Sequence, residues 1–222
     1  MGKPSLVLAS NSPRRRDLLA LGGWTFRTRP AEVDESQLPG EGAGPYVTRL
    51  AQSKARTCAA TTRAEFIILA ADTTVVDGKD ILGKPGNTTE AVEMLRKLRD
   101  RTHQVYTGIA VMRMSDGNLG TDLCVTEVPM RAYSDEEIDK YVASGDPLDK
   151  AGAYGIQNPK FHPVERMSGC YASVMGLPLC HLTRALRKLD ITPLTDISAE
   201  CQSWLKYTCP ISAAVLRGEQ VG

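Results

Sequence analysis

The 222-residue sequence predicts an α/β fold in which helices flank a mixed, twisted sheet. Two observations carry this prediction. Apolar runs typical of strands alternate with helical patterns at both ends of the chain. In the middle of the chain, two Asp-Gly dipeptides separate neighbouring strand-like runs, as they do in antiparallel hairpins.

The N-terminal elements begin with Ser5–Ala9, a run typical of a strand buried on both faces. A helical stripe follows this run at once. Ser12 is expected to be the N-cap of the helix, with Pro13 at the first helical position, and Gly22-Gly23 ends it. The alternating segment Thr25–Arg29 predicts a second strand.

A long helix and a second buried strand come next, after a loop rich in proline, glycine and acidic residues. Over Pro45–Thr61 the apolar residues fall at helical spacing. Phe66–Ala71 predicts a buried strand that ends at Asp72-Thr73-Thr74. The following segment, Val75–Ile81, is expected to form a hairpin with its turn at Asp77-Gly78.

The rest of the patterned chain combines strands and helices around clear local signals. A second Asp-Gly turn lies at Asp116-Gly117, and Ser134 with Glu137 forms a capping box that starts a helix. The expected elements are a helix over Thr88–Leu98, strands over about His103–Met114 and Asn118–Val128, a helix over Asp135–Ala143 and, after a loop-rich stretch, a helix over about Pro178–Leu189.

The length of the chain suffices for one large domain or two small ones that share a cleft. Residues 1–189 hold all the patterned elements and are expected to form the main domain. Residues 190–222 contain two prolines and show no clear period. This tail is therefore expected to lie outside the main unit, and no role is assigned to it.

Charge and composition exclude several classes of protein. The net charge is +1 and aromatic residues make up 5% of the chain, which argues against nucleic-acid binding. No stretch approaches the roughly 20 apolar residues of a membrane span, and the run that ends at Ala9 is too short for a signal-peptide core. The expected location is the cytoplasm. Six cysteines and three histidines lack zinc-ligand spacing, so the cysteines are expected to be buried hydrophobes and free thiols.

Ser10–Arg16, between the first strand and the first helix, predicts an anion site. A strand-to-helix turn presents unpaired backbone N–H groups and the positive end of the helix dipole. Adjacent arginines strengthen such a site, because a guanidinium binds phosphate oxygens in a bidentate manner. An ordinary N-cap followed by a solvated basic turn is the alternative explanation.

Two segments with carboxylates are candidates for cation binding. Glu32–Glu35 lies in the loop after the second strand, and clustered loop carboxylates bind hard cations such as Mg²⁺. A solvated acidic loop has the same composition. Asp72 follows a buried strand, where open α/β sheets place their ligands, and it is suited to binding metal or accepting a proton from water. The alternative is an aspartate that merely ends the strand.

Three further segments are weaker candidates. Lys84 follows the first hairpin and is either a phosphate contact or a surface lysine. Asp149–Gln157 and Met175–Pro178 contain glycines that would let the backbone approach a ligand. Ordinary loop turns explain the same glycines.

The order of these segments resembles the Maf family of nucleoside triphosphate pyrophosphatases. The segments are Leu-Ala-Ser-Asn-Ser-Pro-Arg-Arg, Val-Asp-Glu, Ala-Ala-Asp-Thr, Gly-Lys-Pro, Tyr-Thr-Gly, Asp-Lys-Ala-Gly-Ala-Tyr-Gly-Ile-Gln and Gly-Leu-Pro-Leu. The resemblance covers roughly residues 5–189 and implies two lobes around a central cleft. Ser-Pro-Arg-Arg with Ala-Asp-Thr and Tyr-Gly-Ile-Gln is similar to the branch that acts on dTTP and UTP. The branch that acts on 7-methyl-GTP typically has Trp after Ser-Pro.

The resemblance also implies roles for individual residues. Asp72 would accept the proton of the attacking water, and Glu35 and Asp72 would hold a divalent metal cofactor, Mg²⁺ or Mn²⁺. The residues that would contact the triphosphate are Ser12, Arg15, Lys54 and Lys84. The residues that would set base preference are Arg14, Thr73 and Gln157. Asn158 and Pro159 follow Gln157, where the family pattern has glycine.

The expected reaction is hydrolysis of dTTP or UTP to the monophosphate and pyrophosphate, by attack of water on the α-phosphorus. Two alternatives stay open. One is a pyrophosphatase for another or a modified base, such as 7-methyl-GTP. The other is a nucleotide-binding regulator of cell division without turnover, which Asp72, Glu35 and Lys84 together argue against. The sequence leaves open whether the chain forms a homodimer.

Overall fold

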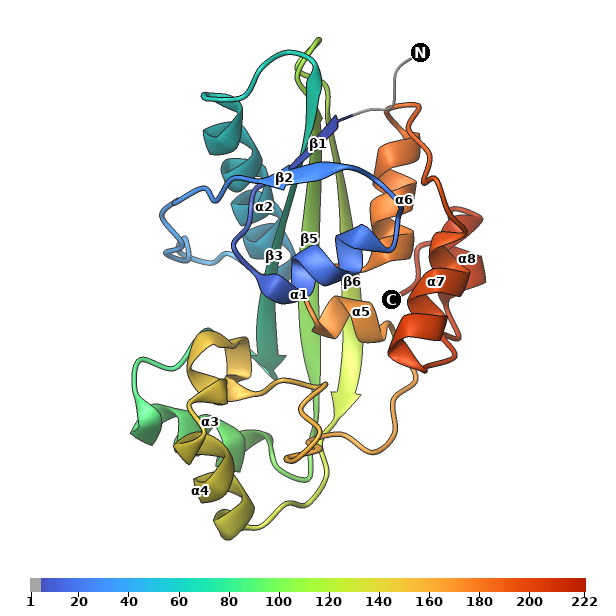
Figure 1. The fold of residues 1–222 in the computed structure, drawn as a ribbon. Coiled ribbons are helices and arrows are strands. Elements are labelled where there is room, and N and C mark those ends of the chain that lie inside the picture. The colour runs from blue at the N-terminus through green and yellow to red at the C-terminus, as the bar shows by residue number, and fades with distance from the viewer. Residues whose placement is uncertain (1–4) are drawn as a thin grey trace.

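The computed structural model describes residues 5–222, in which a six-stranded sheet has helices on both faces (Figure 1). Residues 1–4, which the expected main domain includes, lie outside the described residues. The strands are β1 (Ser5–Leu8), β2 (Phe26–Thr28), β3 (Phe66–Asp77), β4 (Asp80–Leu82), β5 (Thr102–Arg113) and β6 (Leu119–Pro129). The helices are α1 (Pro13–Ala20), α2 (Ala43–Ala59), α3 (Thr88–Leu98), α4 (Asp135–Ala143), α5 (Tyr171–Val174), α6 (Leu179–Arg187), α7 (Ile197–Leu205) and α8 (Ser212–Leu216), with two short 3₁₀-helices, η1 (Asp146–Asp149) and η2 (Ala151–Ala153).

The sheet is mixed, as the sequence predicts. Its strand order is β2-β1-β3-β5-β6, with β4 paired to β3. Strand β1 runs parallel to β2 and β3, whereas β3 runs antiparallel to β4 and β5, and β5 antiparallel to β6. The segments that connect the parallel strands contain α1 and α2. Short turns connect the antiparallel pairs β3–β4 and β5–β6, because only antiparallel strands can be joined by a hairpin.

Strand β3 corrects one prediction. The sequence suggested a strand that ends at Ala71 and a separate hairpin, but β3 continues unbroken from Phe66 to Asp77. Its pairing with β5 continues from Ile67 to Val76, so the polar side chains interrupt the apolar pattern without interrupting the backbone ladder. Asp72 therefore lies within the strand. The turn to β4 is also one residue later than predicted, because Asp77 pairs with Asp80.

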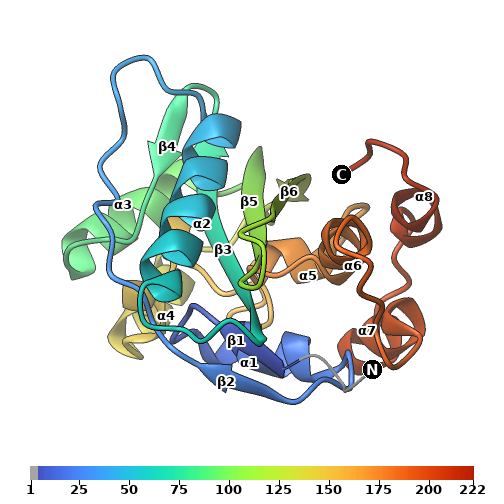
Figure 2. The ribbon, with the colours of Figure 1, turned by 90° about the horizontal axis from the view of Figure 1, so that it is seen from above.

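Successive residues of β3 point to opposite faces of the sheet. Ile68 and Ala70 belong to the small core beneath α2, whereas Ile67 and Leu69 belong to the main core on the other face. Figure 2 shows this layering from above, with α2 on one side of β3 and β5 and with α5 and α6 on the other. The same alternation directs Asp72 towards α2 and Thr73 towards α1 and α5.

Two groups of helices surround the sheet. In Figure 1, α3 and α4 lie together at the lower end of the sheet, and α1, α2 and α6 lie around its upper part. The 3₁₀-helices pack against α3, and η2 also contacts β3. This arrangement corresponds to the two lobes that the resemblance implies.

Residues 190–222 fold onto the main domain. Helices α7 and α8 pack against α6, and Ile191, Ile197 and Cys201 join the main core. The absence of a clear period in the sequence reflects the shortness of these helices, which have nine and five residues. No helix within residues 5–222 has the length and apolar character needed to cross a membrane. All six cysteines are free thiols, and five of them are buried, as expected.

Candidate active site

A cavity of about 450 Å³ opens at the edge of β3. The pairing of β1 with β3 ends at Leu69, and the pairing of β4 with β3 begins at Val75. Within residues 5–222, the five residues 70–74 of β3 are therefore paired with β5 alone. The chain turns away from β1 at this point to begin α1, which leaves a gap in the sheet edge.

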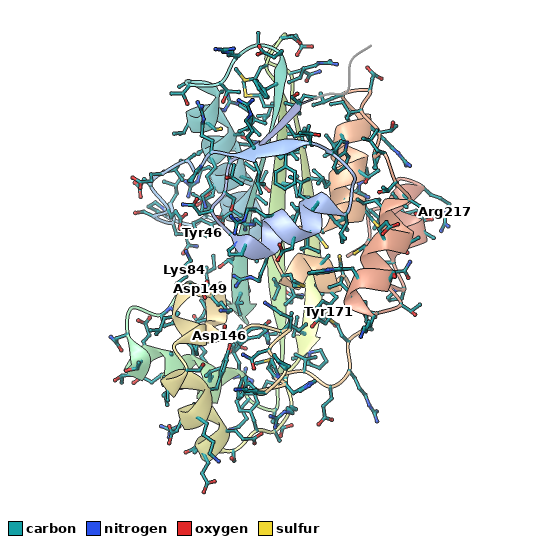
Figure 3. All side chains as sticks on the ribbon, in the orientation of Figure 1. Tyr46, Lys84, Asp146, Asp149, Tyr171 and Arg217 are labelled. Carbon is teal, nitrogen blue, oxygen red and sulfur yellow. The ribbon has the colours of Figure 1, made fainter. Side chains whose placement is uncertain are left out.

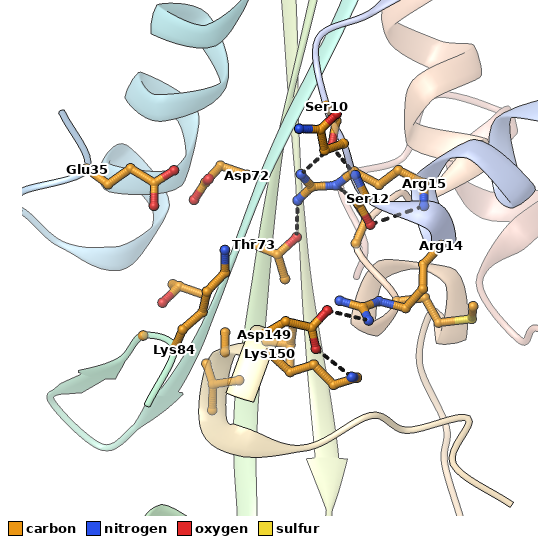
Figure 4. A pocket seen from close by; sticks show the side chains of 18 of the residues that line it. Ser10, Ser12, Arg14, Arg15, Glu35, Asp72, Thr73, Lys84, Asp149 and Lys150 are labelled. Atoms are coloured by element: carbon orange, nitrogen blue, oxygen red, sulfur yellow. Dashed lines mark hydrogen bonds and ion pairs between the residues drawn. The ribbon is translucent and has the colours of Figure 1, made fainter. Parts of the chain in front are cut away.

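All the residues to which the resemblance gives a role line this one cavity, and Figure 4 labels seven of them, all except Lys54 and Gln157. They come from the start of α1, the loop before α2, α2 itself, β3, the segment after β4 and the loop after η2. The residues are Ser12, Arg14, Arg15, Glu35, Lys54, Asp72, Thr73, Lys84 and Gln157. The fold thus gathers side chains that are up to 145 positions apart, from Ser12 to Gln157.

Lys54 lies between two carboxylates. Its Nζ is 2.5 Å from Asp72 Oδ1 and 2.6 Å from Glu35 Oε1, and its side chain is only 12% exposed. The helix face that carries Lys54 is turned inward, because the neighbouring Ala51 and Ala55 are buried. Residue 108, opposite Asp72 on β5, is glycine, and a Cβ atom there would lie 2.7 Å from the backbone of Val47 in α2, so the glycine lets the helix lie close to the sheet.

The electrostatic environment shifts the pKa values of Asp72 and Glu35 in opposite directions. Burial raises the pKa of Asp72, against the opposing charges of Lys54 and Arg15. Burial also acts to raise the pKa of Glu35, but the hydrogen bond and charge of Lys54, with Lys84 and Arg15, outweigh it and leave that pKa lowered. Asp72 is therefore a stronger base than an ordinary aspartate, whereas Glu35 is a weaker base than an ordinary glutamate.

Arg15 is held on the opposite side of β3 by protein acceptors. Its Nε donates to Gly176 O at 2.8 Å, its Nη2 to Thr73 Oγ1 at 3.1 Å and its Nη1 to Ser10 Oγ at 3.4 Å. Burial lowers the pKa of Arg15, with the charge of Asp72 opposing this shift. Arg15 forms no ion pair within residues 5–222, and a guanidinium has five N–H donors. Two donors and the full positive charge remain available to an anion.

The turn before α1 has the predicted N-cap. Ser12 Oγ accepts a hydrogen bond from the backbone N–H of Arg15, and Pro13 occupies the first helical position. The backbone N–H of Ser12 donates to Ser10 Oγ. Two residues after Ser12, Arg14 Nη1 lies 3.7 Å from Asp149 Oδ2, so an ion pair joins α1 to η1 across the cavity (Figure 4).

Lys84 and Gln157 are less constrained than their neighbours. Both line the cavity, and neither side chain makes a hydrogen bond or ion pair with another residue of 5–222. Figure 3 shows Lys84 between Tyr46 above and Asp149 below, at one side of the molecule. Polar groups without protein partners in a cavity are available to a ligand.

Sequence reasoning missed the residues that hold the acidic loop in place. Tyr46 Oη donates to Glu35 O at 2.7 Å, and Arg49 donates to Ser36 O and pairs with Glu41. Tyr46 lies two helical turns before Lys54 on the same face of α2, and this spacing was the available signal. Asp149 and Lys150 also line the cavity, although no role was assigned to them.

The donor set is compatible with a hard divalent cation that arrives with a phosphate ligand. Glu35 and Asp72 present carboxylate oxygens at one end of the cavity. Among residues 5–222, no group of three or more His, Cys, Asp or Glu side chains is arranged to hold a metal ion. Mg²⁺ typically takes one or two carboxylates and completes its shell with phosphate oxygens and water. Two carboxylates are enough for such a site.

Together, the fold and the cavity define a mixed α/β protein whose sheet-edge site is suited to a phosphate-bearing anion. Cationic side chains lie around the site, and two carboxylates lie at one end of it. The chain belongs to the Maf family, because the family model described as "Maf-like protein" matches residues 5–189.

Curated relatives resemble most of the chain. A dTTP/UTP pyrophosphatase of Geobacter sulfurreducens is 44% identical over 189 residues, which are 85% of this chain and 98% of that protein. One of Anaeromyxobacter dehalogenans is 46% identical over 188 residues, 83% of this chain and 94% of the relative. One of Dehalococcoides mccartyi is 40% identical over 190 residues, 86% and 84% of the two chains. Among solved structures, a HAM1 protein from Coxiella burnetii aligns with a TM-score of 0.44 and 15% identity, over 91% of this chain and 96% of that one.

Proposed function

We propose that this chain hydrolyses dTTP or UTP between the α- and β-phosphates, giving the nucleoside monophosphate and pyrophosphate. The observation that carries the proposal is the contact of Asp72 and Glu35 with one ammonium group, inside a cavity that also holds Arg15 and Lys84. A base, a pair of cation ligands and phosphate contacts are what this reaction needs. The relatives that are 40%, 44% and 46% identical are named for the same activity.

In the proposed reaction, Asp72 accepts a proton from water as the water oxygen forms a bond to the α-phosphorus. The bond from that phosphorus to the oxygen bridging the α- and β-phosphates breaks, and pyrophosphate leaves with the electron pair. Lys54 keeps Asp72 ionised and oriented at 2.5 Å. Arg15, Lys84 and the first N–H groups of α1 balance the charge on the departing phosphates. A divalent cation held by Glu35 and Asp72 would supply further neutralisation of phosphate charge.

Base recognition is assigned to Gln157, Arg14 and Thr73, which line the same cavity. The edge of uracil or thymine presents an acceptor, a donor and an acceptor in a row, and a glutamine amide offers one donor group and one acceptor group. Gln157 is suited to this pairing because it lines the cavity and its amide makes no hydrogen bond with another residue of 5–222. Thr73 acts less directly, because its hydroxyl is already bonded to Arg15 and Thr107.

The test is a product analysis over a panel of nucleoside triphosphates with Mg²⁺ or Mn²⁺. UTP and dTTP are expected to give the monophosphate and pyrophosphate, faster than purine triphosphates and 7-methyl-GTP do. Formation of the diphosphate and orthophosphate would place cleavage at the γ-phosphate and contradict the proposal. Binding of UTP without any product would favour a nucleotide-binding regulator instead.

A further inference from the structure

The loop that carries Gln157 is fixed by a carboxylate that the proposed mechanism does not use. Asp146, at the start of η1, lies just below Asp149 in Figure 3 and does not line the cavity. Its side chain accepts hydrogen bonds from Tyr141 Oη at 2.6 Å, Lys150 Nζ at 2.9 Å and Asn158 Nδ2 at 3.1 Å. These donors come from α4, from the start of η2 and from the residue after Gln157.

Gln157 lies inside a turn whose two ends are tied to this carboxylate. The backbone N–H of Asn158 donates to Gly155 O at 3.0 Å, so Gln157 is the third residue of a four-residue turn. Gly155 N donates to Tyr141 Oη at 2.9 Å, and Tyr141 in turn donates to Asp146. The other end of the turn is bonded directly, through the Asn158 amide.

The Asn158 side chain also fixes the chain beyond the turn. Its Oδ1 accepts from the backbone N–H groups of Lys160 at 3.0 Å and Phe161 at 2.8 Å. The Phe161 ring stacks on Tyr141, with centroids 4.1 Å apart and planes at 9°. Asn158 thus fixes the backbone of Phe161, and the Phe161 ring in turn holds the Tyr141 ring in place.

The pKa shifts of Tyr141 and Asp146 favour the hydrogen bond between them near neutral pH. Burial raises the pKa of Tyr141, and the bond to Asp146 raises it further, so the phenol stays protonated and donates. Burial acts to raise the pKa of Asp146, but the bonds from Tyr141 and Lys150 prevail and lower it, so the acceptor stays ionised. The hydrogen bond between Tyr141 and Asp146 therefore keeps its donor proton and its ionised acceptor near neutral pH.

We infer that Tyr141 and Asp146 are positioning residues for base recognition, because they fix the turn Gly155–Asn158 and so aim the Gln157 amide into the cavity. This inference rests on the proposed function, in which Gln157 reads the base. It concerns the orientation of the base and not the phosphate chemistry. Loss of the Tyr141 hydroxyl should therefore weaken pyrimidine binding and leave the rate of the bound substrate largely intact.

The variant Tyr141→Phe removes one oxygen and two hydrogen bonds of the turn network. Tyr133→Phe is a matched control, because Tyr133 is also buried, its Oη also makes a hydrogen bond (to Leu95 O, 2.8 Å) and its ring also packs on Phe161, at 4.8 Å. Within residues 5–222, Tyr133 makes no hydrogen bond with Asp146. In Tyr141→Phe the KM for UTP is expected to rise about tenfold with kcat within about twofold of the native rate, because the loss falls on substrate binding. In Tyr133→Phe both constants should stay within about twofold.

The same KM increase in both variants, or an equal loss of kcat/KM for UTP and for GTP in Tyr141→Phe, would overturn the inference. Asp146→Asn is a second variant that keeps the Tyr141 hydroxyl and the loop length, and it should raise the KM for UTP in the same way. If it does not, the inference fails as well.

Amide hydrogen exchange in the nucleotide-free protein tests the inference independently of turnover. Residues 155–158 should exchange faster in Tyr141→Phe than in Tyr133→Phe at equal global stability. Equal exchange in the two variants refutes the positioning role, whether or not UTP is hydrolysed. Absence of pyrophosphate release by the native protein would instead refute the proposed function alone.

Discussion

Replacement of Asp72 by asparagine tests the proposed base with little change of shape. The Asp72 side chain is buried in β3, and the residue is 7% exposed. The substitution removes one negative charge and the ability to accept a proton, and it keeps the volume and one acceptor oxygen. Lys54 retains its bond to Glu35 at 2.6 Å, so no ammonium group is left without a partner.

The expected loss of activity is large. A positioned general base typically contributes about 10²- to 10⁴-fold to a rate, so kcat for UTP should fall by at least about a hundredfold in Asp72→Asn. The loss should appear in kcat more than in KM, because Asp72 acts on the attacking water and not on the base or sugar.

The expected change in stability is small, and its sign follows from the pKa of Asp72. Burial raises this pKa above its ordinary value of 3.8. Such a group favours the folded state fully only below pH 3.8, and this contribution is lost as the pH rises through the raised pKa. At neutral pH, asparagine avoids the cost of a buried charge but weakens the bond from Lys54. These effects oppose one another, so the free energy of unfolding should change by no more than about 1–2 kcal/mol.

The assay is pyrophosphate release from UTP, with urea unfolding measured in parallel. Asp77→Asn is the matched control, because Asp77 lies on the same strand, is also 7% exposed and is paired with Arg101 at 3.0 Å, yet does not line the cavity. Near-native turnover in Asp72→Asn would refute the assignment. A comparable loss in Asp77→Asn would show that damage to β3, and not loss of a base, lowers the rate.

Three further variants test other parts of the argument. Lys54→Met removes the charge that does most to lower the pKa of Asp72, so this pKa should rise. The acid limb of the plot of kcat/KM against pH should then move to higher pH. An unchanged acid limb would contradict the assignment of Asp72 as the titrating base. In Gly108→Ala, the new methyl group would meet backbone atoms at 2.7 Å, which should cost about 1–3 kcal/mol in urea unfolding, whereas Gly83→Ala meets nothing within 4 Å and should be neutral. In Gln157→Ala, kcat/KM for dTTP and UTP should fall roughly 5- to 150-fold, from about 1–3 kcal/mol, and purine triphosphates should lose less. A uniform loss over all substrates would remove Gln157 from base recognition.

Local signals in the sequence predicted most of the fold. The capping box at Ser134 fixed the start of α4, and the amphipathic spacing of Thr88–Leu98 gave both ends of α3. These features depend on neighbours within one or two helical turns, which a sequence displays directly. The structure of residues 190–222 was harder to predict, because α7 and α8 are short and are held by contacts with residues distant in the sequence. One such contact is the hydrogen bond from Arg187 Nη1 to Leu216 O.

The sequence predicted which residues line the site but not how their side chains contact one another. The ordered motifs named the residues that line the cavity, including Asp72 and Lys54. No sequence pattern indicated that Lys54 would contact both Asp72 and Glu35, because those contacts join three separate elements. Tyr46 and Asp146 were missed for the same reason: they support the site through hydrogen bonds and belong to no conspicuous motif.

The continuous pairing of β3 with β5 explains both why the predicted strand end at Asp72 was wrong and how the site is built. Polar residues in mid-strand suggested a strand end, yet backbone pairing with β5 holds Asp72 opposite Gly108 and Thr73 opposite Thr107. A strand end would leave both side chains on a mobile loop. A paired strand holds them on opposite faces of the sheet, with Asp72 towards Lys54 and Thr73 towards Arg15. Because the outer edge is open between β1 and β4, both side chains still reach one cavity, so the carboxylate and the phosphate-binding guanidinium keep fixed positions relative to each other.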